Sequence, residues 1–239
     1  MPTRQPLWRL FYSGWSAVRT AVLDALFPIP PAEREVLAMG AATAFRDLPR
    51  APRCSIPDAC SIYAYGDERV SRLIWAVKYK KSREGSAIAG YALWRAARLF
   101  SLAVPAGMRI LVVPMPITKQ RRRERGYNQC ELILDEMRRC DTEKCLSYAP
   151  GLLVRVRHTS RQTMKDRAGR LESVKDLFAV NEMAAKALQR SQETNKIMPK
   201  DFFIVVIDDV ITTGSTIKDA ITTLRAAGFE NTYGLSVAH

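Results

Sequence analysis

The chain has 239 residues, of which 47% are hydrophobic and 26% charged, as in a soluble globular protein with one substantial core. Its formal net charge of +13 indicates anionic partners, such as nucleotides, nucleic acid or a membrane surface. The five cysteines are odd in number and lack framework spacing, which argues against a disulfide scaffold and favours reduced thiols in the cytoplasm.

The sequence of residues 1–60 predicts an N-terminal extension that is partly helical and partly irregular. Apolar residues recur at helical spacing across residues 7–27, which predicts an amphipathic helix packed on a core or a partner. Charged residues interrupt this segment, so neither a membrane span nor a signal peptide is expected, although association with a membrane surface stays open. Residues 28–60 are rich in proline and alanine, with one helix expected near residues 32–45.

From residue 61 to residue 239, strands alternate with helices, which predicts an α/β domain with a parallel sheet flanked by helices. Gly228 is expected to end the last helix in a left-handed conformation. The expected strands are residues 61–65, 109–113, 152–156, 177–180, 202–207 and 232–238. The expected helices are residues 70–77, 87–102, 126–139, 167–176 and 216–227.

The most informative stretch is FFIVVIDDVITTGST, residues 202–216. Its first six residues are aromatic or β-branched, as in a strand buried on both faces of a parallel sheet. Asp208 and Asp209 follow where this strand would end, and an ionised carboxylate can accept two neighbouring sugar hydroxyls. The next loop leads into a helix, whose unpaired N–H groups suit a phosphate. This loop consists of Thr212, Thr213, Gly214, Ser215 and Thr216.

A phosphate site beside a pair of acids describes a ribose 5-phosphate, and residues 204–216 resemble the phosphoribosyl-pyrophosphate (PRPP) motif of the type I phosphoribosyltransferases. A Walker B strand is the alternative, but the sequence contains no GxxxxGK[ST] string and no dinucleotide-binding G-x-G-x-x-G. The resemblance implies that Asp208 and Asp209 bind the ribose of PRPP and that residues 212–216 bind its 5-phosphate.

Two basic runs each follow a predicted strand. The first contains Lys119, Arg121, Arg122, Arg123 and Arg125, and the second is RVRHTSRQTMKDR, residues 155–167. Ligands bind beyond the carboxyl ends of the strands in open α/β sheets. We therefore expect both runs to form basic loops that attract an anion such as a pyrophosphate. A solvated surface is the alternative for each run, and for the first it would be an exposed helix face.

The order and spacing of these motifs resemble the ComF family, phosphoribosyltransferase-like proteins associated with DNA uptake in competent bacteria. The resemblance covers most of the chain from Tyr63 onward and rests on IWAVKYKK, VPMPITKQRRRERGYNQ, RVRHTSRQTMKDR, LFAV and VVIDDVITTGST. It implies a pyrophosphate loop at residues 113–118. The candidates on this side of the site are Pro114, Met115, Pro116, Arg122 and Arg125.

One departure from the family concerns zinc. Many members carry pairs of CxxC before the first strand, as in a four-sulfur zinc ribbon. Here only Cys54 and Cys60 occur in that region, so the zinc module is expected to be degenerate and no protein metal site is predicted.

The resemblance implies transfer of ribose 5-phosphate from PRPP to an acceptor, with release of pyrophosphate and no protein nucleophile. Mg²⁺ bound through PRPP, together with the arginines, would stabilise charge on the leaving group. A non-catalytic PRPP sensor and a competence protein that handles single-stranded DNA or DNA-uptake proteins are the alternatives. Single-strand binding usually needs stacking aromatics, and the basic runs offer only Tyr127 and His158. The acceptor and the oligomeric state stay open.

Overall fold

The computed structural model describes residues 29–52, 56–105, 107–156, 177–190 and 198–239. Five strands form one sheet in the order β1-β7-β6-β2-β3, and each neighbouring pair is parallel. These strands are β1 (Ala59–Tyr63), β2 (Arg109–Pro114), β3 (Ser147–Tyr148), β6 (Phe202–Val210) and β7 (Thr232–Ala238). The predicted parallel α/β sheet is therefore confirmed.

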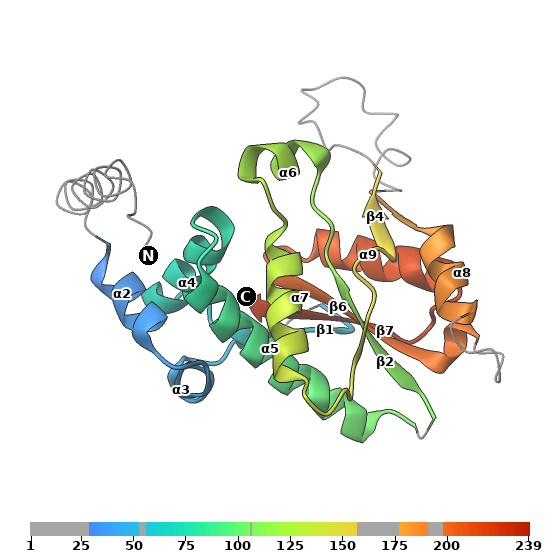
Figure 1. The fold of residues 1–239 in the computed structure, drawn as a ribbon, viewed down its shortest axis with the longest axis horizontal. Helices are drawn as coiled ribbons and strands as arrows, with labels where there is room; N and C mark the ends of the chain where they lie inside the picture. Colours follow the sequence, from blue (N-terminus) through green and yellow to red (C-terminus); the bar gives the residue numbers. More distant parts are fainter. Residues whose placement is uncertain (1–28, 53–55, 106, 157–176, 191–197) are drawn as a thin grey trace, which may run out of the picture.

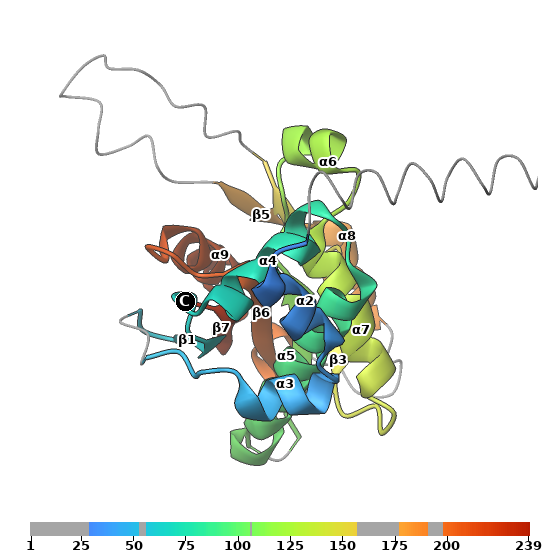
Figure 2. The same ribbon diagram turned by 90° about the vertical axis from the view of Figure 1, so that its left-hand side faces the viewer.

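Helices cover both faces of this sheet, and Figure 2 shows α9 on one side of the strands and α5 and α7 on the other. The first face carries α2 (Pro31–Ala38), α3 (Ala41–Asp47), α4 (Glu68–Tyr79), α5 (Arg83–Ala103) and α7 (Gln129–Cys140). The second carries α9 (Ser215–Ala226), α8 (Glu182–Arg190) and an antiparallel ribbon of β4 (Leu153–Arg155) and β5 (Phe178–Val180). A 3₁₀ turn, Pro199–Asp201, precedes β6.

Strand β6 lies between two hydrophobic cores, and its side chains alternate between them. Val205 and Ile207 pack into the core beneath α5 and α7, whereas Ile204 and Val206 pack into the core beneath α9. All four side chains are fully buried. This two-sided burial explains the uncharged sequence of the strand, and the arrangement is consistent with a type I phosphoribosyltransferase-like fold.

The first basic run forms a short helix, α6 (Lys119–Arg125), rather than the expected loop, and this helix stands apart from the sheet (Figure 1). Thr118 begins it, because its Oγ1 accepts the N–H of Arg121 at 3.1 Å. Gly126 ends it with a φ of 79°. The helix predicted over residues 126–139 therefore starts later than expected, at Gln129, where α7 begins.

Other differences concern the edges of the fold. Strand β1 lies two residues before the expected 61–65, and β4 pairs with β5 outside the main sheet. Two helices, α2 and α3, replace the single helix expected near residues 32–45, because Met39 and Gly40 are extended. The helices predicted at residues 7–27 and 167–176 lie outside the described residues, as does Cys54. In the part of the chain that the structure describes, no helix has the length and apolarity needed to cross a membrane.

An ion pair between a buried carboxylate and a partly exposed ammonium joins α2 to the end of α4. The Glu33 side chain on α2 is 1% exposed, and the Lys80 ammonium, just after α4, lies 2.6 Å from its Oε1. The other carboxylate oxygen of Glu33 has no hydrogen-bond partner in the described structure. Lys80 also lies 4.9 Å from the centre of the Trp75 ring. The ion pair thus fixes α2 against the end of α4.

Lys80→Met should lower the free energy of unfolding by about 3 kcal/mol, because it leaves the Glu33 carboxylate buried without its cation. Chemical denaturation measures this loss. Lys119→Met, which removes an exposed lysine from α6, is the control and should leave the stability nearly unchanged. Adding Glu33→Gln to Lys80→Met should recover most of the loss, and a double variant no more stable than Lys80→Met would contradict this account.

Candidate functional site

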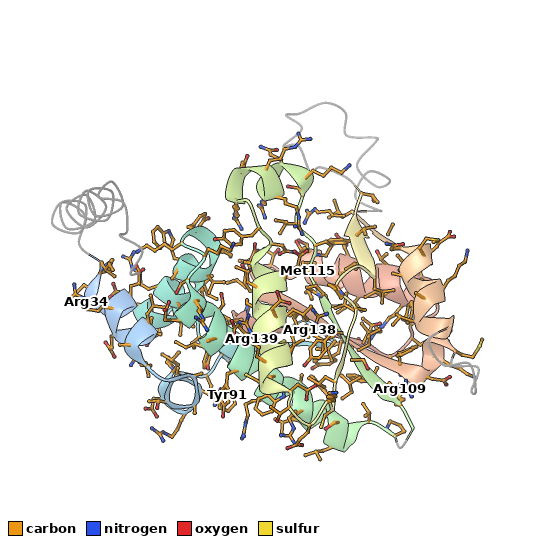
Figure 3. The ribbon with its side chains drawn as sticks, viewed as in Figure 1. Arg34, Tyr91, Arg109, Met115, Arg138 and Arg139 are labelled. Carbon is orange, nitrogen blue, oxygen red and sulfur yellow. The ribbon has the colours of Figure 1, made fainter. Side chains whose placement is uncertain are left out.

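A cavity of about 470 Å³ lies beyond the carboxyl ends of β2 and β6. Figure 3 labels the two ends of β2: Met115 follows the strand on the side of α6, and Arg109 begins it at the opposite edge. Met115 borders the cavity, together with the residues that follow β6. The structure therefore brings the strand-end motifs of the sequence to one place, as expected for an open parallel sheet.

The two acids at the end of β6 have different surroundings. Asp208 is partly buried, and its Oδ1 accepts the N–H of Asp209 at 2.8 Å and the thiol of Cys130 at 3.5 Å. Asp209 is 4% exposed, and its Oδ1 accepts the N–H of Val210 at 2.7 Å. The Lys78 ammonium lies 3.2 Å from Asp209 Oδ2, in an ion pair without hydrogen-bond geometry.

These surroundings shift the ionisation of Asp208 and Cys130. Loss of hydration, followed by repulsion from Asp209, raises the pKa of Asp208 from 3.8 to about 7. Burial, followed by the same two carboxylates, raises the pKa of the Cys130 thiol well above its ordinary value. Cys130 is therefore a protonated hydrogen-bond donor to Asp208, and the ionised form of Asp208 needs hydroxyl donors or cations to stabilise it.

The loop after the acids has the form of an anion site. Gly214 adopts a φ of 77°, and a Cβ there would lie 1.7 Å from Cδ1 of Ile56, so only glycine fits. No side chain caps α9, so its first-turn N–H groups remain available to a ligand. Thr212, Thr213, Gly214 and Thr216 border the cavity, whereas Ser215 does not.

The arginines of α6 divide between the cavity and the solvent. Arg121 and Arg125 lie one helical turn apart and both border the cavity. Arg125 donates to Gln129 Oε1 at 3.1 Å and lies 5.1 Å from the centre of the Tyr79 ring. Arg122 does not border the cavity and pairs with Glu131.

Among the proline-loop candidates, Met115 and Pro116 border the cavity and Pro114, the last residue of β2, does not. The helical period of α6 explains why Arg122 lies away from the cavity while Arg121 lies beside it. A loop prediction could not make this distinction.

Two further cations, Lys78 and Arg155, border the cavity, and neither was predicted individually as a site residue. Lys78 belongs to α4, within the IWAVKYKK segment that contributed to the family resemblance. Arg155 ends β4, and its half-buried guanidinium has an Nε without a hydrogen-bond partner in the described structure. Burial and then the charge of Arg121 lower the pKa of Arg155. Its position in the second basic run was the sequence signal for it, and residues 157–167 of that run lie outside the described residues.

The segment between α6 and α7 holds the walls of the cavity together. Asn128 donates from Nδ2 to the carbonyl of Met115 at 3.0 Å, while its Oδ1 accepts the N–H of Cys130 at 3.0 Å. The Tyr127 hydroxyl donates to the carbonyl of Val77 and accepts the N–H of Lys81, both at 3.0 Å. The GYN sequence therefore ties the end of β2 to α7 and to the end of α4.

No protein-family model matches the sequence. The chain is 28% identical over 141 residues to a protein named competence protein F, from Haemophilus influenzae. The match covers 56% of this chain and 55% of that protein, so the chain spans about half the length of this relative. The similarity supports the resemblance to the ComF family and carries no information about PRPP.

Proposed function

We propose that the protein binds PRPP with Mg²⁺ and transfers its ribose 5-phosphate to an acceptor, with release of pyrophosphate. The observation that supports this most directly is the acid pair of β6 beside the uncapped start of α9, within one cavity. The other walls of that cavity carry the cations Lys78, Arg121, Arg125 and Arg155. Acids for a diol, free N–H groups for a phosphate and cations for a pyrophosphate are the three elements that PRPP requires.

In this proposal each part of the ligand has its own wall. The 5-phosphate lies at the start of α9, and the ribose hydroxyls donate to Asp208 and Asp209. The pyrophosphate extends towards Met115 and Pro116, which the Asn128 side chain fixes through the Met115 carbonyl. The arginines of α6 that border the cavity lie on this side.

The chemistry is a displacement at C1 of the ribose. The acceptor supplies the electron pair for the new bond to C1, and the bond from C1 to the pyrophosphate oxygen breaks with its electrons on the leaving group. Negative charge therefore grows on the pyrophosphate, where Arg121, Arg125 and Arg155 stabilise it. The ribose is held by the acids while the positive charge on its ring develops.

Magnesium would add charge neutralisation at the pyrophosphate. Mg²⁺ prefers oxygen ligands and usually combines one or two carboxylates with substrate phosphates. The carboxylates of Asp208 and Asp209 border the cavity and fit that donor set, with PRPP supplying the remaining oxygens.

A second candidate is binding of single-stranded DNA. The name of the relative concerns competence, and the net charge of +13 is compatible with a nucleic-acid partner. Exposed aromatic side chains lie at the cavity: Tyr65 and Tyr79 border it, and Trp75 lies next to Tyr79. Aromatic side chains next to cations are the usual platform for stacked bases.

Thermal unfolding of the full chain tests the first proposal. PRPP with Mg²⁺ should raise the melting temperature, because a ligand that binds only the folded form stabilises it. Pyrophosphate release in the presence of candidate acceptors should then separate a transferase from a sensor. No thermal shift would contradict PRPP binding, and a shift without turnover across the acceptors would support the sensor.

Salt dependence tests the second candidate. Affinity for single-stranded DNA should fall with a slope of about −0.7 per neutralised phosphate in a plot of log affinity against log salt. Submicromolar binding with a steep slope, together with an absent response to PRPP, would favour the nucleic-acid function.

A further inference from the structure

Lys78 borders the same cavity as the acid pair. It lies on the last turn of α4, its side chain is 23% exposed, and it borders the cavity. Its ammonium is 3.2 Å from Asp209 Oδ2 but makes no hydrogen bond to the described part of the protein. An ammonium carries three donors, so Lys78 has donors to spare for a ligand.

The backbone of Lys78 is held by contacts on both sides. Tyr127 binds the carbonyl of Val77 and the N–H of Lys81, and Glu33 binds the side chain of Lys80. The end of α4 is therefore fixed from α2 and from the α6–α7 connection. These contacts position Lys78 without using its ammonium, as expected for a group that is kept for a ligand.

The charges around Asp209 give Lys78 two functions. In the ligand-free protein it is the cation that balances a buried carboxylate, which would otherwise be costly to ionise. When an anionic ligand enters, its remaining donors can form charge-assisted hydrogen bonds to phosphate oxygens. Arg125 is already engaged with Gln129 and Tyr79, which leaves Lys78 as a more available donor.

We propose that Lys78 is a pyrophosphate-binding residue, which pairs with Asp209 in the ligand-free protein and donates to the pyrophosphate when PRPP binds. This assignment rests on the proposed PRPP function and adds to it a residue outside the strand-end motifs. It also explains how helix α4, which α2 holds in place through Glu33, forms part of the site.

The test compares three ligands by titration calorimetry: PRPP, ribose 5-phosphate and inorganic pyrophosphate, each with Mg²⁺. Lys78→Met should raise the dissociation constants of PRPP and pyrophosphate roughly 10- to 100-fold, the loss expected for a hydrogen bond between charged groups. The dissociation constant of ribose 5-phosphate should change less than about threefold, because that ligand lacks the pyrophosphate. The titrations are carried out at pH 8.5, above the raised pKa of Asp208.

Two variants serve as controls. Lys200→Met removes one positive charge from the turn before β6 at an exposed position that does not border the cavity, and it should leave all three affinities nearly unchanged. Lys78→Arg keeps the charge and should retain most of the pyrophosphate affinity. If Lys78→Met does not fold, Lys78→Gln provides the same comparison with a polar side chain.

Equal weakening of all three ligands would overturn the proposal, because Lys78 would then act only through Asp209. Unchanged PRPP affinity in Lys78→Met would overturn it as well. A wild-type protein that binds none of the three ligands would instead refute the PRPP function itself, so the two failures are distinguishable.

Discussion

Replacing Asp208 and Asp209 together by asparagine should abolish the stabilisation of the protein by PRPP and Mg²⁺. Both carboxylates border the cavity at the end of β6, and asparagine keeps their size while it removes the charge that, in the proposed function, binds hydroxyls and magnesium. Loss of two hydrogen bonds to charged groups should weaken PRPP binding roughly 100-fold or more. The measurement is the shift of melting temperature across a PRPP titration.

The control for this variant is Asp219→Asn. Asp219 is a partly buried carboxylate on the first turns of α9, and it does not border the cavity. This substitution removes a carboxylate close to the phosphate loop and should leave the PRPP response intact. A double variant of Asp208 and Asp209 that keeps the full PRPP response would refute the ribose-binding assignment.

Without ligand, the difference in stability between Asp208→Asn and the wild type should also depend on pH. The pKa of Asp208 is raised in the folded protein, so the folded state holds this proton more tightly than the unfolded chain does. Ionisation of Asp208 therefore lowers the stability of the wild type as the pH rises from 3.8 to about 7. Asparagine removes this loss, and the melting temperature of the variant relative to the wild type should increase across that range. A constant difference would contradict the raised pKa.

The motif at the end of β6 could be predicted from the sequence because local constraints determine its residues. Burial on both faces requires an uncharged run at residues 202–207, and the two acids stand near the end of the same strand, just before the glycine loop. Neither feature depends on distant parts of the chain. The parallel sheet is confirmed, whereas the strand is longer than predicted: β6 extends to Val210 and includes both acids.

Residues brought together by tertiary packing were harder to predict. Lys78 reaches Asp209 from a helix more than a hundred positions earlier in the chain, and the connection depends on how α4 packs against the sheet. The same holds for Ile56, which closes over Gly214. No local pattern records either contact.

The arginines of α6 show a different limit of prediction from sequence. Five cations within seven positions suggest a loop or a solvated face, and the signals for a helix were the Thr118 cap and Gly126 at its end. Once the segment is helical, its period decides which arginines face the cavity. The sequence therefore favoured Arg122 as a site residue, whereas Arg121, and not Arg122, borders the cavity.

Gly214→Ala should disrupt the phosphate loop more strongly than a surface substitution can. Two effects destabilise the folded variant. Alanine is strained in the left-handed backbone conformation of residue 214, and its Cβ would lie 1.7 Å from Ile56 Cδ1. Together they should lower the free energy of unfolding by about 3 kcal/mol, and displacement of the loop should weaken PRPP binding roughly 10-fold or more. Denaturant unfolding and PRPP titration measure the two effects separately.

Two controls test this prediction: Gly228→Ala alone, and Ile56→Ala combined with Gly214→Ala. Gly228 has a φ of 91° at the far end of α9, but a Cβ there meets only Pro199 at an ordinary 3.7 Å. Gly228→Ala should therefore cost about 1 kcal/mol of stability through its backbone and leave PRPP affinity unchanged. Adding Ile56→Ala to Gly214→Ala should remove the overlap and recover part of the stability, while the backbone term of about 1 to 2 kcal/mol remains. A Gly214→Ala variant that behaves like Gly228→Ala in both measurements would show that the loop needs no glycine to hold its ligand.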